Sequence, residues 1–323
     1  MGFAIIGTGS ALPSKTISNE QLSTFLDTSN EWIESRTGIL ERRVCTTETL
    51  TDLCAQAATA ALKQAGLTPQ DLDLIICASI TGDTIIPSQA CMIQSALGTN
   101  CPALDINTAC TGFIYALDIA AGYYARERVK HVLIVAAEAM SRIVDWTDRS
   151  ICVLFGDGAG AAVLGPGDDL LSIKISARGD DKALFLEGHV GNSPFSAFRP
   201  INPFVSMDGQ EVFKFAVGSL VQDLRDVIAQ ANLQMEEITY VLPHQANMRI
   251  IKAAIPRLGL APQKFLTNIA RLGNISAASI PILLDESSRE GRFHPGDILA
   301  LSAFGGGLTS GACVFRWGLP HSE

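Results

Sequence analysis

Three residues of this sequence, Cys110, His244 and Asn274, have side chains that together could do chemistry on a thioester. Cys110 lies in DINTACTGF (105–113), directly before a long, almost uncharged run over residues 112–124 that predicts a buried helix. A cysteine at the N-terminus of a buried helix faces unpaired N–H groups and the positive end of the helix dipole, so we expect its thiolate to be favoured. His244 and Asn274 follow downstream in the segments VLPHQAN and LGNISAAS. A Cys–His–Asn set indicates acyl transfer.

The three positions matter jointly, because each signal alone has an ordinary explanation. Most of the eight cysteines are expected to be small buried hydrophobes, and an asparagine beside a glycine can be a simple turn. Taken together, Cys110 is the predicted nucleophile, since acyl transfer from one sulfur to another is nearly thermoneutral. His244 and Asn274 are the predicted hydrogen-bond donors to a thioester oxygen that becomes an enolate. A hydrolase-like arrangement, in which the asparagine orients the histidine, stays open.

The composition is that of a well-buried globular protein, because 47% of the 323 residues are apolar and 18% are charged. This length suggests about two domains. A net charge of −9 argues against nucleic acid as a partner, and no apolar stretch approaches the length of a membrane span. The N-terminal residues lack the charged start of a signal peptide, and the cysteines show neither framework spacing nor a CxxC motif. These features predict a cytoplasmic protein with reduced thiols and no metal site.

An internal repeat predicts the elements that must position these residues. Residues 65–76 (AGLTPQDLDLII) match residues 231–242 (ANLQMEEITYVL) as helix end, acidic turn and apolar strand, at an offset of 231 − 65 = 166. Residues 130–136 (KHVLIVA) match residues 296–302 (GDILALS) at the same offset. Two separate segments at one offset argue for a duplicated unit rather than chance.

The repeat divides the chain into an N-terminal half, residues 1–165, that carries the cysteine, and a C-terminal half, residues 166–323, that carries the histidine and the asparagine. Within each half, short apolar runs alternate with helical patterns, which indicates α/β layering with largely parallel strands. The offset pairs Cys110 with Ser276 beside Asn274, so a pseudo-twofold axis would bring the ligand-binding loops of both halves together. The expected strands are residues 3–6, 74–77, 132–136, 161–164, 240–242, 298–301 and 312–315.

Three further segments have candidate roles. The run Gly305–Gly307 allows close backbone approach, and it predicts either an oxyanion hole or a tight turn. The segment FGDGAG (155–160) lacks the strand–GxGxxG–helix order of a phosphate loop, so a turn entering a strand is predicted there. Lys214, Arg249 and Lys252 are basic residues of an acidic chain, which indicates either an acidic partner or ordinary solvated surface.

These segments together resemble β-ketoacyl-acyl-carrier-protein synthase III of the thiolase-like superfamily, over essentially the whole chain. The markers are EWIESRTGI (31–39), PSQAC (87–91), ACTGF (109–113), FGDGAG (155–160), MDGQEVFK (207–214), HQAN (244–247), GNISAAS (273–279) and GGG (305–307). The resemblance implies a duplicated α/β thiolase-like fold of five layers, α-β-α-β-α, and a homodimer.

The resemblance also implies a reaction, the initiating condensation of type II fatty-acid synthesis. A short acyl-CoA, acetyl-CoA or similar, would acylate Cys110, and malonyl-acyl-carrier protein would then lose CO₂ while His244 and Asn274 stabilise the enolate. Attack of the carbanion on the acyl-cysteine would give 3-oxoacyl-acyl-carrier protein. Backbone N–H groups of Cys110 and Gly306 would form the oxyanion hole, and no cofactor is implied.

Matching positions imply the binding contacts. Trp32 and Arg149 match residues that sandwich the adenine of CoA in the family, and Lys214, Arg249 and Lys252 match a basic patch for the acidic carrier protein.

Ile86 stands before Pro87, where the family often has a phenylalanine that approaches the acyl pocket of the partner subunit. The smaller side chain predicts room for acyl groups longer than acetyl. Relatives with the same three residues act in secondary metabolism, which is the alternative function, while silent partners that lack the nucleophile do not fit a chain with Cys110.

Overall fold

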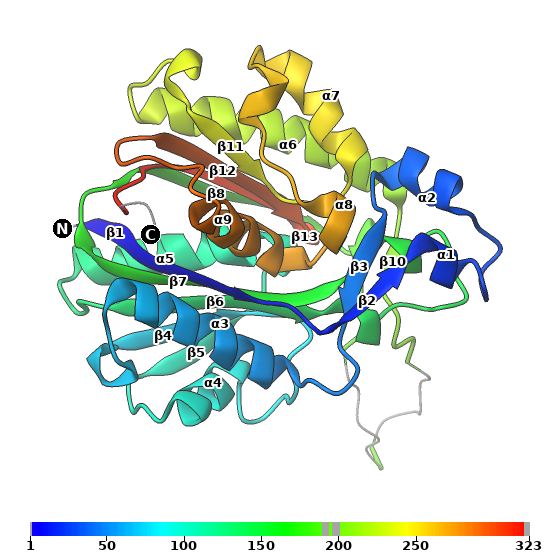
Figure 1. Ribbon diagram of the computed structural model, residues 1–323, viewed down its shortest axis with the longest axis horizontal. Coiled ribbons are helices and arrows are strands. Elements are labelled where there is room, and N and C mark those ends of the chain that lie inside the picture. The colour runs from blue at the N-terminus through cyan, green and yellow to red at the C-terminus, as the bar shows by residue number, and fades with distance from the viewer. Residues whose placement is uncertain (1, 189–193, 196–200, 320–323) are drawn as a thin grey trace.

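The computed structural model describes residues 2–188, 194–195 and 201–319. Two mixed β-sheets dominate it (Figure 1). The first sheet has, in spatial order, β1 (Gly2–Ala11), β7 (Asp157–Gly167), β6 (Val132–Ala139), β4 (Leu74–Ala78) and β5 (Ala103–Ile106). The second has β11 (Tyr240–Pro243), β12 (Ile298–Gly305), β13 (Gly307–Arg316) and β8 (Leu170–Asp180). All seven strands expected from apolar runs lie within these elements.

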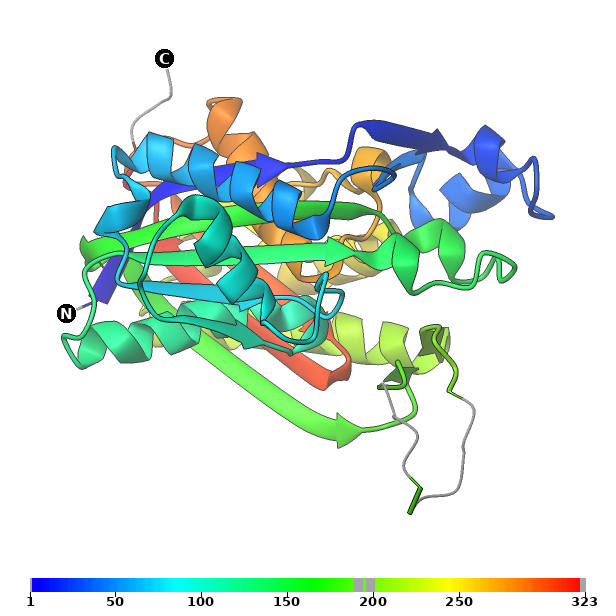
Figure 2. The ribbon, with the colours of Figure 1, turned by 90° about the horizontal axis from the view of Figure 1, so that it is seen from below.

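Three layers of helices enclose the two sheets and complete the predicted five-layer fold (Figures 1 and 2). One outer layer, on the first sheet, consists of α3 (Leu50–Ala65) and α4 (Gln89–Leu97). The central layer, between the sheets, consists of α5 (Gly112–Ala125) and α9 (Ser279–Arg289). The other outer layer, on the second sheet, consists of α6 (Gly209–Gln230) and α7 (Met248–Leu258).

Smaller elements surround one end of these layers. They are β2 (Lys15–Ser18), α1 (Asn19–Leu22), α2 (Asn30–Thr37), β3 (Glu41–Val44), β9 (Leu184–Phe185), β10 (Ser206–Met207) and α8 (Ile269–Leu272). Short 3₁₀ helices are η1 (Pro69–Asp71), η2 (Ala109–Thr111), η3 (Met140–Arg142), η4 (Cys152–Leu154), η5 (Met235–Glu237), η6 (Pro262–Lys264) and η7 (Ser276–Ala278).

The prediction of largely parallel strands is wrong. The pairs β4–β5, β4–β6 and β11–β12 are parallel, but β1–β7, β6–β7, β12–β13 and β13–β8 are antiparallel. A parallel connection needs a crossover of about a dozen residues or more, and only Gly306 separates β12 from β13. Continuous apolar runs showed that the strands are covered on both faces, and they did not determine the strand direction.

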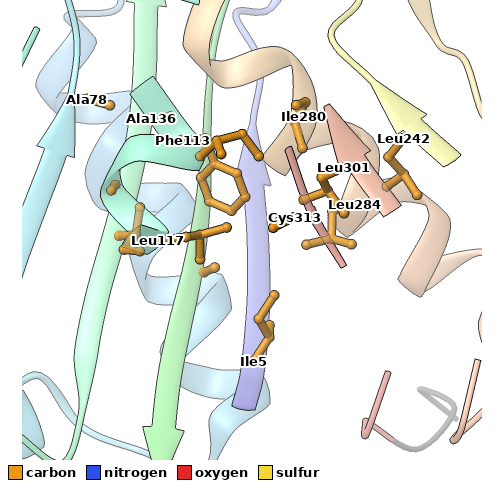
Figure 3. Close-up of a cluster of buried hydrophobic side chains, with 14 of the residues drawn as sticks. Ile5, Ala78, Phe113, Leu117, Ala136, Leu242, Ile280, Leu284, Leu301 and Cys313 are labelled. Carbon is orange, nitrogen blue, oxygen red and sulfur yellow. The ribbon is translucent and has the colours of Figure 1, made fainter. Parts of the chain in front are cut away.

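The central helices make the core that joins the two sheets. Phe113 and Leu117 of α5 and Ile280 and Leu284 of α9 project from the helices, between strands of the first sheet and strands of the second (Figure 3). This packing explains part of the FGDGAG segment, because a Cβ at Gly160 of β7 would lie 2.7 Å from the backbone nitrogen of Ile282 in α9. The segment enters a strand as predicted, since residues 157–160 belong to β7, but the predicted turn is wrong, because Phe155 forms a bridge with Asn274.

The duplicated elements follow two slightly different offsets. The starts of β4 and β11 differ by 240 − 74 = 166, and those of β6 and β12 by 298 − 132 = 166. The starts of α5 and α9 differ by 279 − 112 = 167, so one residue is inserted before the second helix. The structural counterpart of Cys110 is therefore Ala277, and the predicted match to Ser276 is wrong by one position.

Candidate active site

A deep cleft of about 1850 Å³ lies at the carboxyl ends of both sheets. Residues that directly follow β4, β5, β6, β11 and β12 line it, so its walls come from both repeats of the fold. The three predicted chemical residues, Cys110, His244 and Asn274, line this one cleft although they are far apart in sequence. Ligand pockets for drug-sized molecules are about 300–1,000 Å³, so this cleft suits a larger substrate.

Cys110 lies in η2, the 3₁₀ turn that leads from β5 into α5. The preceding Ala109 has a positive φ of 47°, which bends the chain sharply at this point. The predicted helix is present, but the prediction of a favoured thiolate is wrong in this structure. Burial raises the pKa of the Cys110 thiol to about 12, because desolvation outweighs the hydrogen bond between the Cys110 sulfur and the Ser276 hydroxyl. Cys110 therefore needs a proton acceptor.

His244 directly follows β11 and is almost completely buried, with 1% of its surface exposed. Its ring packs edge-on against Phe304, at 5.3 Å between centroids. Neither ring nitrogen has a hydrogen-bond partner in the part of the chain that the structure describes. Burial lowers the pKa of His244 to about 3, so the imidazole is neutral and a poor proton acceptor at neutral pH. A buried ring that lines a cleft with two unpaired nitrogens is suited to a hydrogen bond with a ligand.

Asn274 is held by backbone and side chain in the connection between α8 and η7. Its N–H donates to the carbonyl of Leu154 at 2.9 Å, and its Oδ1 accepts from the Ser276 N–H at 2.8 Å. Because Oδ1 is occupied, the amide orientation leaves Nδ2 as the free donor of the side chain. No hydrogen bond joins Asn274 to the His244 ring, so the asparagine does not orient the histidine as it would in a hydrolase.

The Gly305–Gly307 run lies directly against the nucleophile. A Cβ at Gly305 would lie 2.8 Å from the backbone nitrogen of Cys110 and 3.0 Å from its Cβ. The run is the tight turn between β12 and β13, and Gly306 also lines the cleft. A tight turn and an oxyanion hole are compatible predictions for this run, since the turn itself brings the backbone of Gly306 close to that of Cys110.

Trp32 and Arg149 meet beside the cleft. The Arg149 guanidinium lies 5.1 Å from the centre of the Trp32 ring and pairs with Asp27, while Arg36 lies 4.6 Å from the same ring. A flat base between Trp32 and Arg149 would need two contacts of about 3.5 Å, or about 7 Å in total. Arg149 must therefore move before an adenine can be sandwiched there.

The predicted carrier-protein residues lie on the two outer helices of the second sheet. Lys214 of α6 and Arg249 of α7 are exposed and line the cleft, whereas Lys252 is exposed and does not. Lys214 pairs with Glu211 at 2.7 Å, and Arg249 lies over the Phe213 ring at 5.8 Å.

Ile86 is 88% exposed and does not line the cleft of its own chain. Its predicted place at the pocket of a partner subunit stays a prediction.

Sequence reasoning missed two side chains of the site. Phe304 packs on His244, and the fully buried Glu138 accepts a hydrogen bond from Ser276 beside Cys110. A usable signal existed for Glu138, because an ionisable residue at the end of an otherwise apolar strand is unusual.

Comparison with known proteins bears on this site. Residues 104–179 match the family model described as 3-oxoacyl-[acyl-carrier-protein (ACP)] synthase III, and residues 228–317 match the model of its C-terminal part. The β-ketoacyl-[acyl-carrier-protein] synthase III of Aquifex aeolicus is 44% identical over 98% of this chain and 100% of that protein.

The chain belongs to the β-ketoacyl-[acyl-carrier-protein] synthase III family. The crystal structure of the Aquifex aeolicus protein has a TM-score of 0.92 against this chain, which confirms the thiolase-like fold. The enzyme of Clostridium acetobutylicum is also 44% identical, over 97% of this chain and 98% of that protein. As a member of this family, the chain is an acyltransferase, a condensing enzyme of the kind that initiates fatty-acid synthesis.

A third relative comes from secondary metabolism. The priming β-ketosynthase of the R1128 polyketide biosynthetic pathway has 33% identity and a TM-score of 0.91, over 99% of this chain and 97% of that one.

In the described residues no helix is long and apolar enough to cross a membrane, and no group of His, Cys, Asp and Glu side chains is placed to hold a metal ion.

Proposed function

We propose that this chain condenses a short acyl-CoA, acetyl-CoA or similar, with malonyl-acyl-carrier protein to give 3-oxoacyl-acyl-carrier protein, CoA and CO₂. Cys110 attacks the acyl thioester and becomes the acyl-cysteine. Malonyl-carrier protein then loses CO₂, the resulting carbanion attacks the acyl-cysteine carbonyl, and the bond from that carbon to the Cys110 sulfur breaks to return the free cysteine. The reaction as written is balanced without a metal or a redox cofactor.

The single observation that carries this proposal is the His244 ring, neutral and without a partner on either nitrogen, in the same cleft as Cys110. A neutral imidazole can donate one hydrogen bond, and the free Nδ2 of Asn274 can donate another. Two such donors stabilise the enolate oxygen that forms when CO₂ leaves. The backbone N–H groups of Cys110 and Gly306 have the same task for the tetrahedral oxyanion of the cysteine thioester.

The substrate contacts belong to the same proposal. Trp32 and Arg149 would hold the adenine of CoA after Arg149 moves, and Lys214, Arg249 and Lys252 would attract the acidic carrier protein. Trp32, Lys214 and Arg249 line the cleft, Arg149 lies over the Trp32 ring, and Lys252 is on the same helix as Arg249.

The assembly is also proposed rather than observed. A homodimer is supported by the exposed apolar pair Ile85 and Ile86, since apolar side chains that are 74% and 88% exposed are typical of interfaces. A division into halves at about residue 165 is supported by strand membership, because β8, which begins at Leu170, is the first strand of the second sheet. A cytoplasmic location is supported by eight unpaired cysteines.

A priming role in secondary metabolism is the second candidate, favoured by the similarity to the R1128 ketosynthase. It shares the acyl-cysteine chemistry and differs in the acyl-CoA that is accepted. Incubation with a panel of acyl-CoAs, followed by intact mass, separates the two.

The test of the main proposal uses alanine variants of the three residues. Cys110→Ala should give no acyl adduct with acetyl-CoA by intact mass. His244→Ala and Asn274→Ala should still be acylated but release CO₂ from malonyl-carrier protein about 10²–10³-fold more slowly, which is the usual effect of losing an oxyanion donor. His131→Ala, on the loop before β6, is the control and should behave as wild type. Equal loss of acylation in all three variants would contradict these roles.

A further inference from the structure

Glu138 is a buried carboxyl group close to the nucleophile for which the chemistry above has no use. It is the seventh residue of β6 and has no exposed surface. Its Oε2 accepts hydrogen bonds from the hydroxyl of Thr81 at 2.5 Å and from the N–H of Ile80 at 3.2 Å. A carboxyl group that receives several donors can hold a negative charge in spite of burial.

Ser276 connects this carboxyl group to the nucleophile. Its hydroxyl donates to Glu138 Oε1 at 3.1 Å and lies within hydrogen-bonding reach of the Cys110 sulfur. The residue has a positive φ of 44°, a strained value for a side chain other than glycine. Its N–H donates to Asn274 Oδ1, so the strained backbone is fixed by the same loop that presents the Asn274 amide.

We propose that Ser276 and Glu138 form a proton relay for the Cys110 thiol, in which Ser276 accepts the thiol proton and passes its own hydroxyl proton to Glu138. The sulfur then attacks the thioester carbonyl carbon, and the bond from that carbon to the leaving sulfur breaks. The proton returns through Ser276 to the leaving thiolate, so that Glu138 and Ser276 end as they began. Glu138 acts through Ser276 and does not itself contact the sulfur. The step rests on the proposed function only in its choice of thioester.

The local charges are consistent with this role. Burial raises the pKa of Glu138 to about 7, which is close to the working pH expected of a proton acceptor. Cys110 from η2 faces it across Ser276, and burial raises the pKa of that thiol. Cys77 of β4 packs in the hydrophobic cluster on the other face of the sheet, where its contact with Cys54 and burial raise its pKa. The residue opposite Glu138 on β7 is Gly158, and Asp157 precedes it in the chain. The Asp157 carboxylate does not contact Glu138, because it accepts hydrogen bonds from Ser141 and Cys45. Among the described residues no ion pair involves Glu138, so no neighbouring cation lowers the proton affinity of this carboxyl group.

His244 is a weaker candidate for the same task. Burial lowers the pKa of His244 to about 3, which makes the ring a poor proton acceptor, whereas burial raises the pKa of Glu138 to about 7. The two tasks therefore fall to different side chains, with His244 and Asn274 as donors to the substrate oxygen and Glu138 as the proton acceptor.

The test measures the rate at which iodoacetamide alkylates Cys110, located by peptide mass, from pH 6 to 9.5. In Glu138→Gln and Ser276→Ala the rate at pH 7 should fall on the order of 100-fold, and it should recover toward wild type at high pH, where hydroxide removes the proton. The double variant should be no slower than either single one. Asp157→Asn, which removes another buried carboxyl from the neighbouring strand, is the matched control and should alkylate as wild type.

The outcomes are distinct. If Glu138 acted only through its charge, its removal would lower the thiol pKa and speed alkylation, which would overturn the relay. A loss by the same factor at every pH would also overturn it, because this would mean a structural role. Iodoacetamide is not a substrate, so this result is independent of the proposed function, which fails instead if the wild-type chain forms no acetyl adduct with acetyl-CoA.

Discussion

The close contact of Gly305 with Cys110 predicts the effect of adding one methyl group. In Gly305→Ala the new Cβ would lie 2.8 Å from the backbone nitrogen of Cys110, whereas ordinary contact begins at 3.4 Å. The difference, 3.4 − 2.8 = 0.6 Å, must come from movement of one backbone against the other. Both neighbouring atoms belong to the nucleophile's own main chain and β-carbon, so no flexible side chain can absorb it.

The expected result is slower acylation in a folded protein. Overpacking of this kind costs about 1–3 kcal/mol, and a misplacement of about 1 Å at a reacting group can cost about 10²-fold in rate. We expect the rate constant for acylation of Cys110 by acetyl-CoA to fall about 10- to 100-fold. The measurement is the growth of the acyl adduct by intact mass, with thermal denaturation to show that the variant is folded.

Gly122→Ala on α5 is the matched control, because a Cβ there would meet nothing within 4 Å. It should acylate at the wild-type rate, and a helical Gly-to-Ala change of this kind is typically neutral or stabilising. If folded Gly305→Ala acylates as fast as Gly122→Ala, the turn between β12 and β13 does not position the nucleophile and the reasoning is refuted.

Three other outcomes are expected. Arg249→Glu should raise KM for malonyl-carrier protein, and the effect should shrink with added salt, which screens charges over about 8 Å. The control Arg128→Glu, on the loop before β6, should leave KM unchanged. A normal KM for the Arg249 variant at low salt would remove Arg249 from the docking surface. The wild-type protein should accept acyl-CoAs of about three to five carbons, since burial of each methylene contributes about 0.8 kcal/mol of binding free energy. Ile86→Phe should select against the longer acyl groups. An unchanged preference would mean that another residue sets the chain length. Because burial lowers the folded-state pKa of His244 to about 3, the unfolded chain binds a proton there first, so stability should fall as pH drops from about 6.5 toward 3. His244→Asn should reduce that slope by up to about one proton in urea denaturation measured across this range, and parallel curves would show that the ring titrates normally.

Some features of this protein followed from local sequence alone. Apolar runs such as those of β4 and β6 must be covered on both faces, because a strand with almost no polar side chains has no face suited to water. The repeat at one offset placed the same elements in both halves, and the uncharged run after Cys110 predicted α5. Residue type and local context singled out the three chemical residues, and the fold brings them into one cleft.

Other features depended on contacts between distant segments, which a local pattern does not contain. Strand direction was decided by connection length, as in the turn at Gly306, and the extra residue before α9 became visible only when the helix starts were compared. Dipole reasoning predicted a reactive thiolate at Cys110, but the sign of the pKa shift was decided by how much water the fold removes around the sulfur. The juxtaposition of Glu138, Ser276 and Cys110 comes from β6, η7 and η2, elements that meet only because the two repeats pack face to face.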